Sequence, residues 1–288
     1  SYGALGAFAS GVGSTDLAAV WRTGKTWLRV PRTIRVEIQG RLQPGVQAKD
    51  LTLFIVGRVG MAGATYQAIE FCGEGVAALA LSERLTLANM AVEMGAKVGI
   101  VHPDGLELPQ AFSPVRPDVD AHYARHLAFD ARTLRPQISA PGAPDRVFDL
   151  GTYVGTPISY AFIGTCVNGR LEDLHTAAQV LRDSRVAPGV RLIIAPASRE
   201  IFLQALSDGT VERLTRAGAT FIPSGCGPCV GTHNGVPGNN ETVISTANRN
   251  FKGRMGNPQA LVFLGAPSSV AAAARMGCIT DPTPFLES

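Results

Sequence analysis

The sequence predicts an α/β fold in which parallel sheets dominate. Three observations support this prediction. Short apolar strands alternate with helices over the second half of the chain, 45% of the 288 residues are hydrophobic while only 17% are charged, and 32 glycines and 19 prolines supply turns between short elements. Strands that alternate with helices favour a parallel sheet covered on both faces. In such sheets functional groups lie in the loops beyond the carboxyl ends of the strands.

The first half of the chain shows one clear half-buried strand. Residues 33–39 alternate between apolar and polar side chains, which is typical of a strand with one buried face. Residues 14–16 are suited to begin a short helix over 17–21. The other elements predicted in this half are helices at 48–59 and 82–93 and a short strand at 98–101. Residues 131–148 are rich in proline and poor in large apolar side chains, so they predict a linker.

The second half has a more regular alternation of strand and helix. Its predicted strands lie at 160–164, 190–197, 219–223, 243–246 and 260–264. Its predicted helices lie at 172–182, 198–217 and 268–277. The strand at 160–164 and the strand at 219–223 are each followed by a turn that contains cysteine, and such turns are where chemistry is expected.

Composition excludes several classes of function. The net charge is only +3 and no run of five or more basic residues occurs, so a nucleic-acid partner is not indicated. No apolar stretch reaches the roughly 18 residues that a membrane-spanning helix needs. Five cysteines in a chain without an export signal are expected to be reduced thiols. We therefore expect a cytoplasmic protein without a membrane or nucleic-acid partner.

Three of the cysteines form a constellation. Cys166 lies in the segment Gly-Thr-Cys-Val-Asn-Gly, and Cys226 and Cys229 lie in Gly-Cys-Gly-Pro-Cys. A CxxC pair alone suits zinc, an iron–sulfur cluster or a redox disulfide. Zinc would need a further ligand, which His233 could supply, whereas the glycines after Cys229 disfavour the long helix of a thioredoxin-type dithiol. Three thiolates with an open fourth position suit a [4Fe–4S] cluster that acts as a Lewis acid.

Polar residues near the CxxC pair indicate the substrate class. Asn248, Arg249 and Arg254 fall within one short segment. Guanidinium groups bind carboxylates through two parallel hydrogen bonds, so two arginines beside a metal-binding loop predict a dicarboxylate or tricarboxylate substrate. The alternative for an isolated arginine is a solvated surface loop.

Together these segments resemble the aconitase superfamily, and most closely its isopropylmalate dehydratase and homoaconitase branch. The resemblance lies in Ser-Thr-Ala-Asn-Arg-Asn-Phe-Lys-Gly-Arg at 245–254, in both cysteine loops, and in the segments 3–16 and 70–76. It covers essentially the whole chain. One departure is Val167, where threonine usually follows the first cysteine; it removes a hydroxyl but no ligand.

The resemblance implies a fold of aconitase-like α/β/α units with mainly parallel sheets and a truncated first domain. Residues 1–33 are then a remnant of the first domain, residues 34–145 a second α/β domain, and residues 146–288 a third domain that carries the cysteines. Cys166, Cys226 and Cys229 correspond to the three ligands of a [4Fe–4S] cluster. Asn248, Arg249 and Arg254 correspond to substrate-binding residues. Cys72 and Cys278 match no ligand position and are expected to be buried small hydrophobic residues.

The resemblance also implies a hydro-lyase that isomerises a 2-hydroxy acid such as isopropylmalate by dehydration and rehydration, as part of leucine biosynthesis. In this branch the catalytic base is a serine of a separate small subunit, so no catalytic base is expected within these residues. The family has an Asp-Ser-His-Thr motif just before the glycine-rich opening segment. We therefore expect two partners, an N-terminal portion of the large subunit and a small subunit, and an inactive chain without them. The alternatives are a homoaconitase, aconitase or dimethylmalate-type hydratase, or a regulatory binding protein without a cluster.

Overall fold

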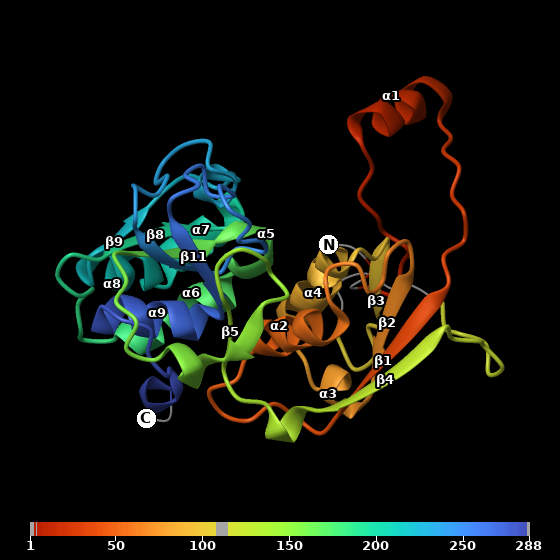
Figure 1. Cartoon of the computed structure of the whole chain (residues 1–288), viewed down its shortest axis with the longest axis horizontal. Helices are drawn as coiled ribbons and strands as arrows, with labels where there is room; N and C mark the ends of the chain where they lie inside the picture. Colours follow the sequence, from red (N-terminus) through yellow and green to blue (C-terminus); the bar gives the residue numbers. More distant parts are fainter. Residues whose placement is uncertain (1–2, 4, 108–114, 287–288) are drawn as a thin grey trace. The chain divides into compact units, whose positions relative to one another are not determined.

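The chain divides into two compact units, each of which contains its own sheet (Figure 1). The structure is a computed structural model that describes residues 3, 5–107 and 115–286. Unit 1 comprises residues 1–40 and 61–130, and unit 2 comprises residues 41–60 and 131–288. The chain thus leaves unit 1 after residue 40, returns after residue 60 and leaves again after residue 130. The domain limits that the sequence suggested, at 33 and 145, stay a proposal.

Unit 1 contains a four-stranded parallel sheet in the order β3-β2-β1-β4. Its strands are β1 (Thr33–Gln39), β2 (Ala68–Cys72), β3 (Val98–Val101) and β4 (Arg125–Asp130). The predicted strand at 33–39 is confirmed, and its apolar side chains are fully buried. The helices α3 (Glu74–Ala77) and α4 (Leu81–Met90) pack against this sheet, and the short helix η1 (Ala91–Met94) follows α4.

A projecting segment precedes β1 in unit 1. Its helix α1 (Ser14–Thr23) buries none of its residues, and Figure 1 shows it standing away from the sheet of its unit. The side chains of Trp21 and Trp27 are 81% and 85% exposed, and Val30 is 85% exposed. Apolar side chains gathered on one exposed segment are typical of a protein–protein contact.

Unit 2 contains a seven-stranded sheet in the order β6-β5-β11-β10-β7-β8-β9. Its parallel strands are β7 (Tyr160–Gly164), β8 (Arg191–Ala195), β9 (Ala219–Phe221), β10 (Thr242–Ser245) and β11 (Leu261–Gly265). The short strands β5 (Gln137–Ser139) and β6 (Val147–Asp149) continue it in antiparallel fashion. The prediction of an α/β fold with mainly parallel sheets is therefore confirmed.

Helices pack against the sheet of unit 2. They are α2 (Ala48–Val59), α5 (Thr165–Asn168), α6 (Leu171–Leu181), α7 (Arg199–Ser207), α8 (Thr210–Arg216) and α9 (Pro267–Met276). Alanines of α9 are fully buried, and this small-residue helix packs against β7 and α6. Helix α2 packs against β5, β6 and β11, so the segment between residues 41 and 60 is part of this unit although both flanking strands belong to unit 1.

The prediction of a linker at 131–148 was wrong. This segment contains β5 and β6, and Ile138 at its centre is fully buried. Proline and glycine there form the turns around two very short edge strands, and such strands give almost no periodic signal. The predicted helix at 198–217 is two helices, because Gly209 takes a φ of +80° between α7 and α8. Strands β2 and β4 were not predicted.

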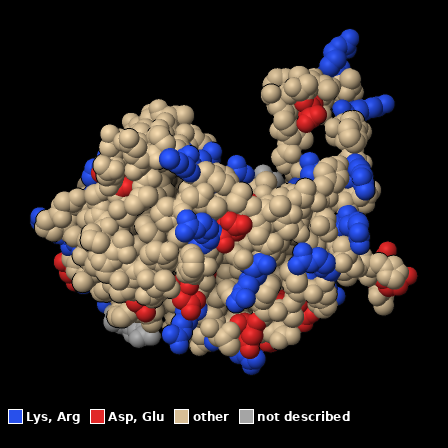
Figure 2. Space-filling view, viewed as in Figure 1, with Lys and Arg blue, Asp and Glu red and all other residues tan. Residues whose placement is uncertain are grey.

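The surface carries interspersed charges. On the face shown in Figure 2, Lys and Arg side chains lie among Asp and Glu side chains and form no continuous field of one sign. Within the described ranges, no helix combines the length and the apolar character needed to cross a membrane.

Candidate functional site

Two loops of unit 2 carry the three predicted ligand cysteines. Cys166 lies in the one-turn helix α5, which begins where β7 ends. Cys226 directly precedes the short helix η4 (Gly227–Val230), which contains Cys229 and follows β9. Because β7, β8 and β9 are parallel neighbours, both loops leave the sheet at the same edge.

The three thiols lie close enough to influence one another. Cys166 and Cys226 are exposed, whereas Cys229 is only 8% exposed. Burial raises the pKa of the Cys229 thiol, and the charge and hydrogen bond of the Arg254 guanidinium offset part of this rise. The neighbouring Cys166 and Cys226 thiols raise the pKa of Cys229 further. The structure therefore brings Cys166, Cys226, Cys229 and Arg254 into one site.

A hydroxyl of the neighbouring strand fixes the turn that carries Cys166. The backbone N–H of Gly164 donates to Oγ1 of Thr246 at 2.9 Å, and this hydroxyl donates back to the Gly164 carbonyl at 3.0 Å. Thr165 then adopts a φ of +80°, which is unusual for a β-branched residue. A Cβ on Gly164 would lie 2.8 Å from the carbonyl oxygen of Ala195, so only glycine fits at this exit from β7.

Arg170, four residues after Cys166, also holds this turn in place. The Arg170 guanidinium donates to the backbone carbonyls of Val167 and Cys166. The half-buried Asp173 carboxylate accepts hydrogen bonds from the backbone N–H of Arg170 and from the side-chain amide of Asn168. Burial raises the pKa of Asp173 to about 6. Sequence reasoning missed both Arg170 and Asp173, although an aspartate three residues into a helix is a recognisable signal for a helix N-terminus.

Two glycines fix the position of the CxxC loop. Gly231 ends η4 with a φ of +69°, and a Cβ at this position would lie 2.1 Å from the backbone nitrogen of Gly256. This close backbone approach holds the loop of Cys226 and Cys229 against the segment that carries Arg254. The geometry explains why Arg254, distant in sequence from Cys229, lies beside its thiol.

Three buried polar atoms without partners belong to the segments that carry Cys166 and the predicted substrate-binding residues. Oδ1 of Asn168, Oδ1 of Asn248 and Nε of Arg254 accept or donate no hydrogen bond within the described part of the chain. Such atoms cost roughly 1–3 kcal/mol each when left unpaired, so native proteins seldom keep them without a ligand or water. Asn248 and Arg249 follow β10, the strand next to β7, and they therefore lie at the same edge of the sheet.

The donor set fits an iron–sulfur cluster better than a single metal ion. Among the described residues, no three His, Cys, Asp or Glu side chains converge as ligands of one ion. His233 lies next to Gly227 but does not complete such a set with Cys226 and Cys229. A single ion needs every ligand at one bond length from one point, whereas each thiolate of a cluster binds a different iron. Three cysteine thiols suit the second requirement by their chemistry, because thiolates are the usual ligands of such clusters.

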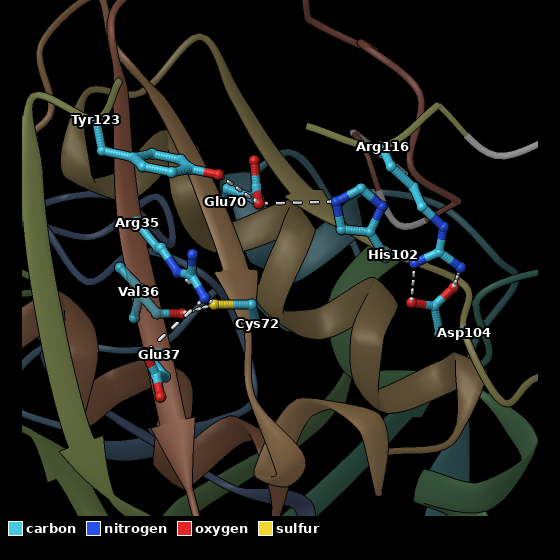
Figure 3. Close-up of polar contacts among 9 residues, drawn as sticks. All are labelled: Arg35, Val36, Glu37, Glu70, Cys72, His102, Asp104, Arg116 and Tyr123. Atoms are coloured by element: carbon cyan, nitrogen blue, oxygen red, sulfur yellow. Dashed lines mark hydrogen bonds and ion pairs between the residues drawn. The ribbon is translucent and has the colours of Figure 1, made fainter. Parts of the chain in front are cut away.

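The other two cysteines have different surroundings. Figure 3 shows Cys72 on β2 of unit 1, where its Sγ accepts a hydrogen bond from Nε of Arg35 at 3.2 Å and donates to the Val36 carbonyl at 3.7 Å. Burial raises the pKa of Cys72, which keeps it a neutral thiol. Sγ of Cys278, in unit 2, lies 3.6 Å from the Thr280 hydroxyl. Both cysteines are half-buried.

Unit 1 has a second polar cluster, around Glu70 (Figure 3). Its Oε1 accepts a hydrogen bond from the Tyr123 hydroxyl at 3.1 Å and lies 3.8 Å from Nε2 of His102. His102 and then Tyr123 lower the pKa of Glu70 against the effect of burial. The Arg84 guanidinium donates to the backbone carbonyl of His102 at 2.6 Å and so fixes the loop after β3. These contacts stabilise the open face of the small sheet.

Comparisons with known proteins give one consistent family. The model of the aconitase family (aconitate hydratase) matches residues 1–157 and 151–277. The chain is 50% identical to 3-isopropylmalate dehydratase large subunit 1 of Methanopyrus kandleri over 99% of this chain and 70% of that protein. It is 48% identical to a probable methanogen homoaconitase large subunit of Methanosarcina mazei, over 98% of this chain and 73% of that protein. It is 47% identical to the homoaconitase large subunit of Thermus thermophilus, over 98% and 68% respectively.

The close approach of Gly231 to Gly256 generates a first prediction. Gly231→Ala should destabilise the protein by at least about 2 kcal/mol, because it adds the strain of an L-residue at positive φ to a clash with backbone. Gly189→Ala is the matched control: Gly189 has a φ of +81° but nothing lies within 4 Å of its added Cβ. Thermal unfolding of both variants measures the difference. An equal fall in Tm for the two variants would contradict the close packing.

Proposed function

The chain belongs to the aconitase family, and from this membership we propose that it is the iron–sulfur large subunit of a hydro-lyase that isomerises a 2-hydroxy dicarboxylate of the isopropylmalate type. The observation that supports this proposal most strongly is the meeting of Cys166, Cys226 and Cys229 with Arg254 at one edge of the unit 2 sheet. Several relatives, including the one at 50% identity, are named 3-isopropylmalate dehydratase large subunit. We place the reaction in leucine biosynthesis and in the cytoplasm, where reduced thiols persist.

We propose that Cys166, Cys226 and Cys229 hold a [4Fe–4S] cluster. Two thiols are exposed. Burial raises the pKa of the third, Cys229, but the Arg254 guanidinium beside it favours the thiolate form that a metal ligand needs. When bound, the cluster supplies a Lewis-acidic iron without a protein ligand, at which the hydroxyl and one carboxylate of the substrate are polarised.

The substrate carboxylates are assigned to the arginines. The unpaired Nε of Arg254 and the guanidinium of Arg249 present fork-shaped donors at the edge of the sheet that carries the cysteines. Carboxylates held by both arginines fix the C–H bond of the substrate in one orientation, which removes rotational freedom before the proton is taken. The positive charges also stabilise the additional negative charge that develops on the carboxylate.

The proton is removed by a group outside this chain. The relatives are named large subunits, which indicates a small-subunit partner for those proteins. We propose that a small subunit supplies the serine base to this chain as well. The relatives are also longer, and this chain spans about 70% of their length. We propose that an N-terminal portion bearing the Asp-Ser-His-Thr motif packs against the exposed apolar segment around α1.

A homoaconitase activity is the second candidate. Relatives at 48% and 47% identity are named homoaconitase large subunits, so sequence similarity alone separates the two activities poorly. Their substrates differ in one arm, which is a branched apolar group in isopropylmalate and a carboxylate-bearing chain in homoaconitate. Turnover of both compounds by one preparation of the assembled enzyme decides between them. A regulatory role without a cluster is disfavoured by the retained set of thiols and unpaired polar atoms.

The cluster assignment predicts a selective response to cysteine substitution. Cys166→Ser, Cys226→Ser and Cys229→Ser should each abolish cluster binding, because a neutral hydroxyl is a poor ligand for iron. Cys72→Ser and Cys278→Ser serve as matched controls and should retain it. Iron and sulfide content and the brown absorbance of anaerobically reconstituted protein measure the outcome. If Cys72→Ser loses the cluster as completely as Cys226→Ser, the ligand assignment is wrong.

The carboxylate assignment predicts a loss of catalysis on charge-conserving substitution. Arg249→Lys keeps the charge but loses the planar fork, so kcat/KM of the reconstituted enzyme should fall at least about tenfold, or roughly 1.4 kcal/mol. Arg41→Lys, at an exposed position of the same unit, is the control and should leave kcat/KM unchanged. Unchanged kinetics in Arg249→Lys would make Arg249 an ordinary surface residue.

The partner assignment predicts that the isolated chain does not isomerise isopropylmalate. Addition of an N-terminal polypeptide that carries the Asp-Ser-His-Thr motif and of a small subunit should restore turnover. Trp21 and Trp27 are the only tryptophans, so their fluorescence should become protected from acrylamide when the N-terminal polypeptide binds. Turnover at an ordinary enzymatic rate by the isolated chain would contradict this assignment and would place the base within these residues.

A further inference from the structure

The N-terminus of α2 makes contacts with three separate segments of unit 2: the first turn of α9, the start of β5 and the loop that follows β10. Oε1 of Gln47 accepts the backbone N–H of Ser268 at 2.9 Å. The Asp50 carboxylate accepts the backbone N–H of Gln137 at 2.8 Å. Between them, the Lys49 ammonium donates to the backbone carbonyls of Thr246 and Ala247, both at 3.0 Å. These contacts join a helix of the segment 41–60 to the loop that follows β10.

Lys49 is an unusual residue to find in this position. Its side chain is only 1% exposed, and burial of an ammonium group costs several kcal/mol unless hydrogen bonds compensate for the lost water. A helix that only had to pack could use leucine or methionine here. The contacts with two successive carbonyls therefore indicate that the ammonium fixes the conformation of this backbone.

The backbone that Lys49 holds leads directly into the proposed substrate-binding residues. Thr246 and Ala247 are fully buried, and the next two residues are Asn248 and Arg249. On the far side, the buried Asn250 side chain donates to the Ala140 carbonyl at 2.8 Å and to the Val262 carbonyl at 3.1 Å. Asn248 and Arg249 thus form a two-residue tip between two fixed points.

The same backbone also determines the position of the cysteine turn. The Thr246 hydroxyl holds both the N–H and the carbonyl of Gly164, two residues before Cys166. Lys49 therefore acts on a segment that contacts the predicted carboxylate site on one side and the first cysteine turn on the other.

We propose that Lys49 is a positioning residue, whose buried ammonium fixes the Thr246–Ala247 carbonyls so that Asn248 and Arg249 are preorganised to bind a substrate carboxylate. The identity of the ligand in this inference rests on the proposed function. The preorganised loop rests only on the contacts of Lys49 with the two carbonyls. Preorganisation of this kind raises affinity because the loop need not be ordered when the substrate binds.

The test compares Lys49→Met with Lys97→Met in the assembled enzyme with its cluster and both partners. Methionine approximates the length of lysine without the charge or the donors. Lys97 is the matched control, because it belongs to unit 1, where its ammonium lies 5.4 Å from the centre of the Tyr66 ring. Lys49→Gln, which can donate to one carbonyl, serves as a milder variant if Lys49→Met does not fold.

Two readouts are measured. Amide hydrogen exchange at residues 247–250 should accelerate at least tenfold in Lys49→Met while exchange in α9 and β7 stays unchanged. The KM for isopropylmalate should rise at least tenfold with a much smaller change in kcat, and the effect should be non-additive with Arg249→Lys because both substitutions act on one loop. Lys97→Met should match the wild type in both readouts.

The outcomes separate this inference from the proposed function. If folded Lys49→Met, or Lys49→Gln in its place, shows wild-type exchange at residues 247–250 and an unchanged KM, the positioning role is wrong. If the effects of Lys49→Met and Arg249→Lys on KM are simply additive, Lys49 does not act through Arg249 and the proposal also fails. The wild-type enzyme could fail to convert isopropylmalate while amide exchange at residues 247–250 still accelerates in Lys49→Met. In that case the proposed function fails, and the preorganised loop remains supported.

Discussion

The hydrogen-bond exchange between the Thr246 hydroxyl and the backbone of Gly164 is the interaction on which the site depends. It joins the carboxyl ends of β10 and β7 at the point where the two neighbouring parallel strands leave the sheet. One strand leads into the turn of Cys166 and the other into Asn248 and Arg249. It adds to the pairing of the two strands and to the hydrogen bond from the backbone N–H of Thr246 to the Phe162 carbonyl, and it extends this connection into the turn of Cys166. The parallel order of β7 and β10 places both loops at the same edge of the sheet. The Thr246 hydroxyl then fixes the position of one loop relative to the other.

The electrostatics of the site depend on the different exposure of its thiols: Cys229 is buried, whereas Cys166 and Cys226 are exposed. Cys229 is buried, so the proton on its thiol is retained more strongly than in water, and the Arg254 guanidinium only partly opposes this. In the proposed cluster site iron would displace that proton, so we expect cluster binding to depend on pH. The same guanidinium has an unpaired Nε, so it can stabilise a thiolate and bind a carboxylate at once. In the proposed site one guanidinium therefore serves both the Cys229 thiolate and a substrate carboxylate.

The sequence allowed prediction of the elements with strong periodicity and pointed to candidate site residues, but the contacts that assemble the fold could not be predicted from it. The strand at 33–39 and the helix at 48–59 appear with the expected limits because their apolar patterns are complete. Strands β5 and β6 escaped prediction because three residues are too short for a period-two pattern to emerge. A CxxC pair and two arginines in one short segment are local patterns, so they can be recognised from the sequence alone. The contact of Lys49 with Thr246 spans 197 positions, and only the fold brings the two residues together.

The central claim is that iron is bound where Cys166, Cys226 and Cys229 meet, and the position of the iron tests it most directly. The measurement is anomalous X-ray scattering at the iron edge from crystals of anaerobically reconstituted protein whose iron content has been verified. Our account predicts one compact anomalous peak within bonding distance of the Sγ atoms of these three cysteines. A peak beside Cys72 or Cys278, or a peak bonded to only the CxxC pair and His233, would contradict it.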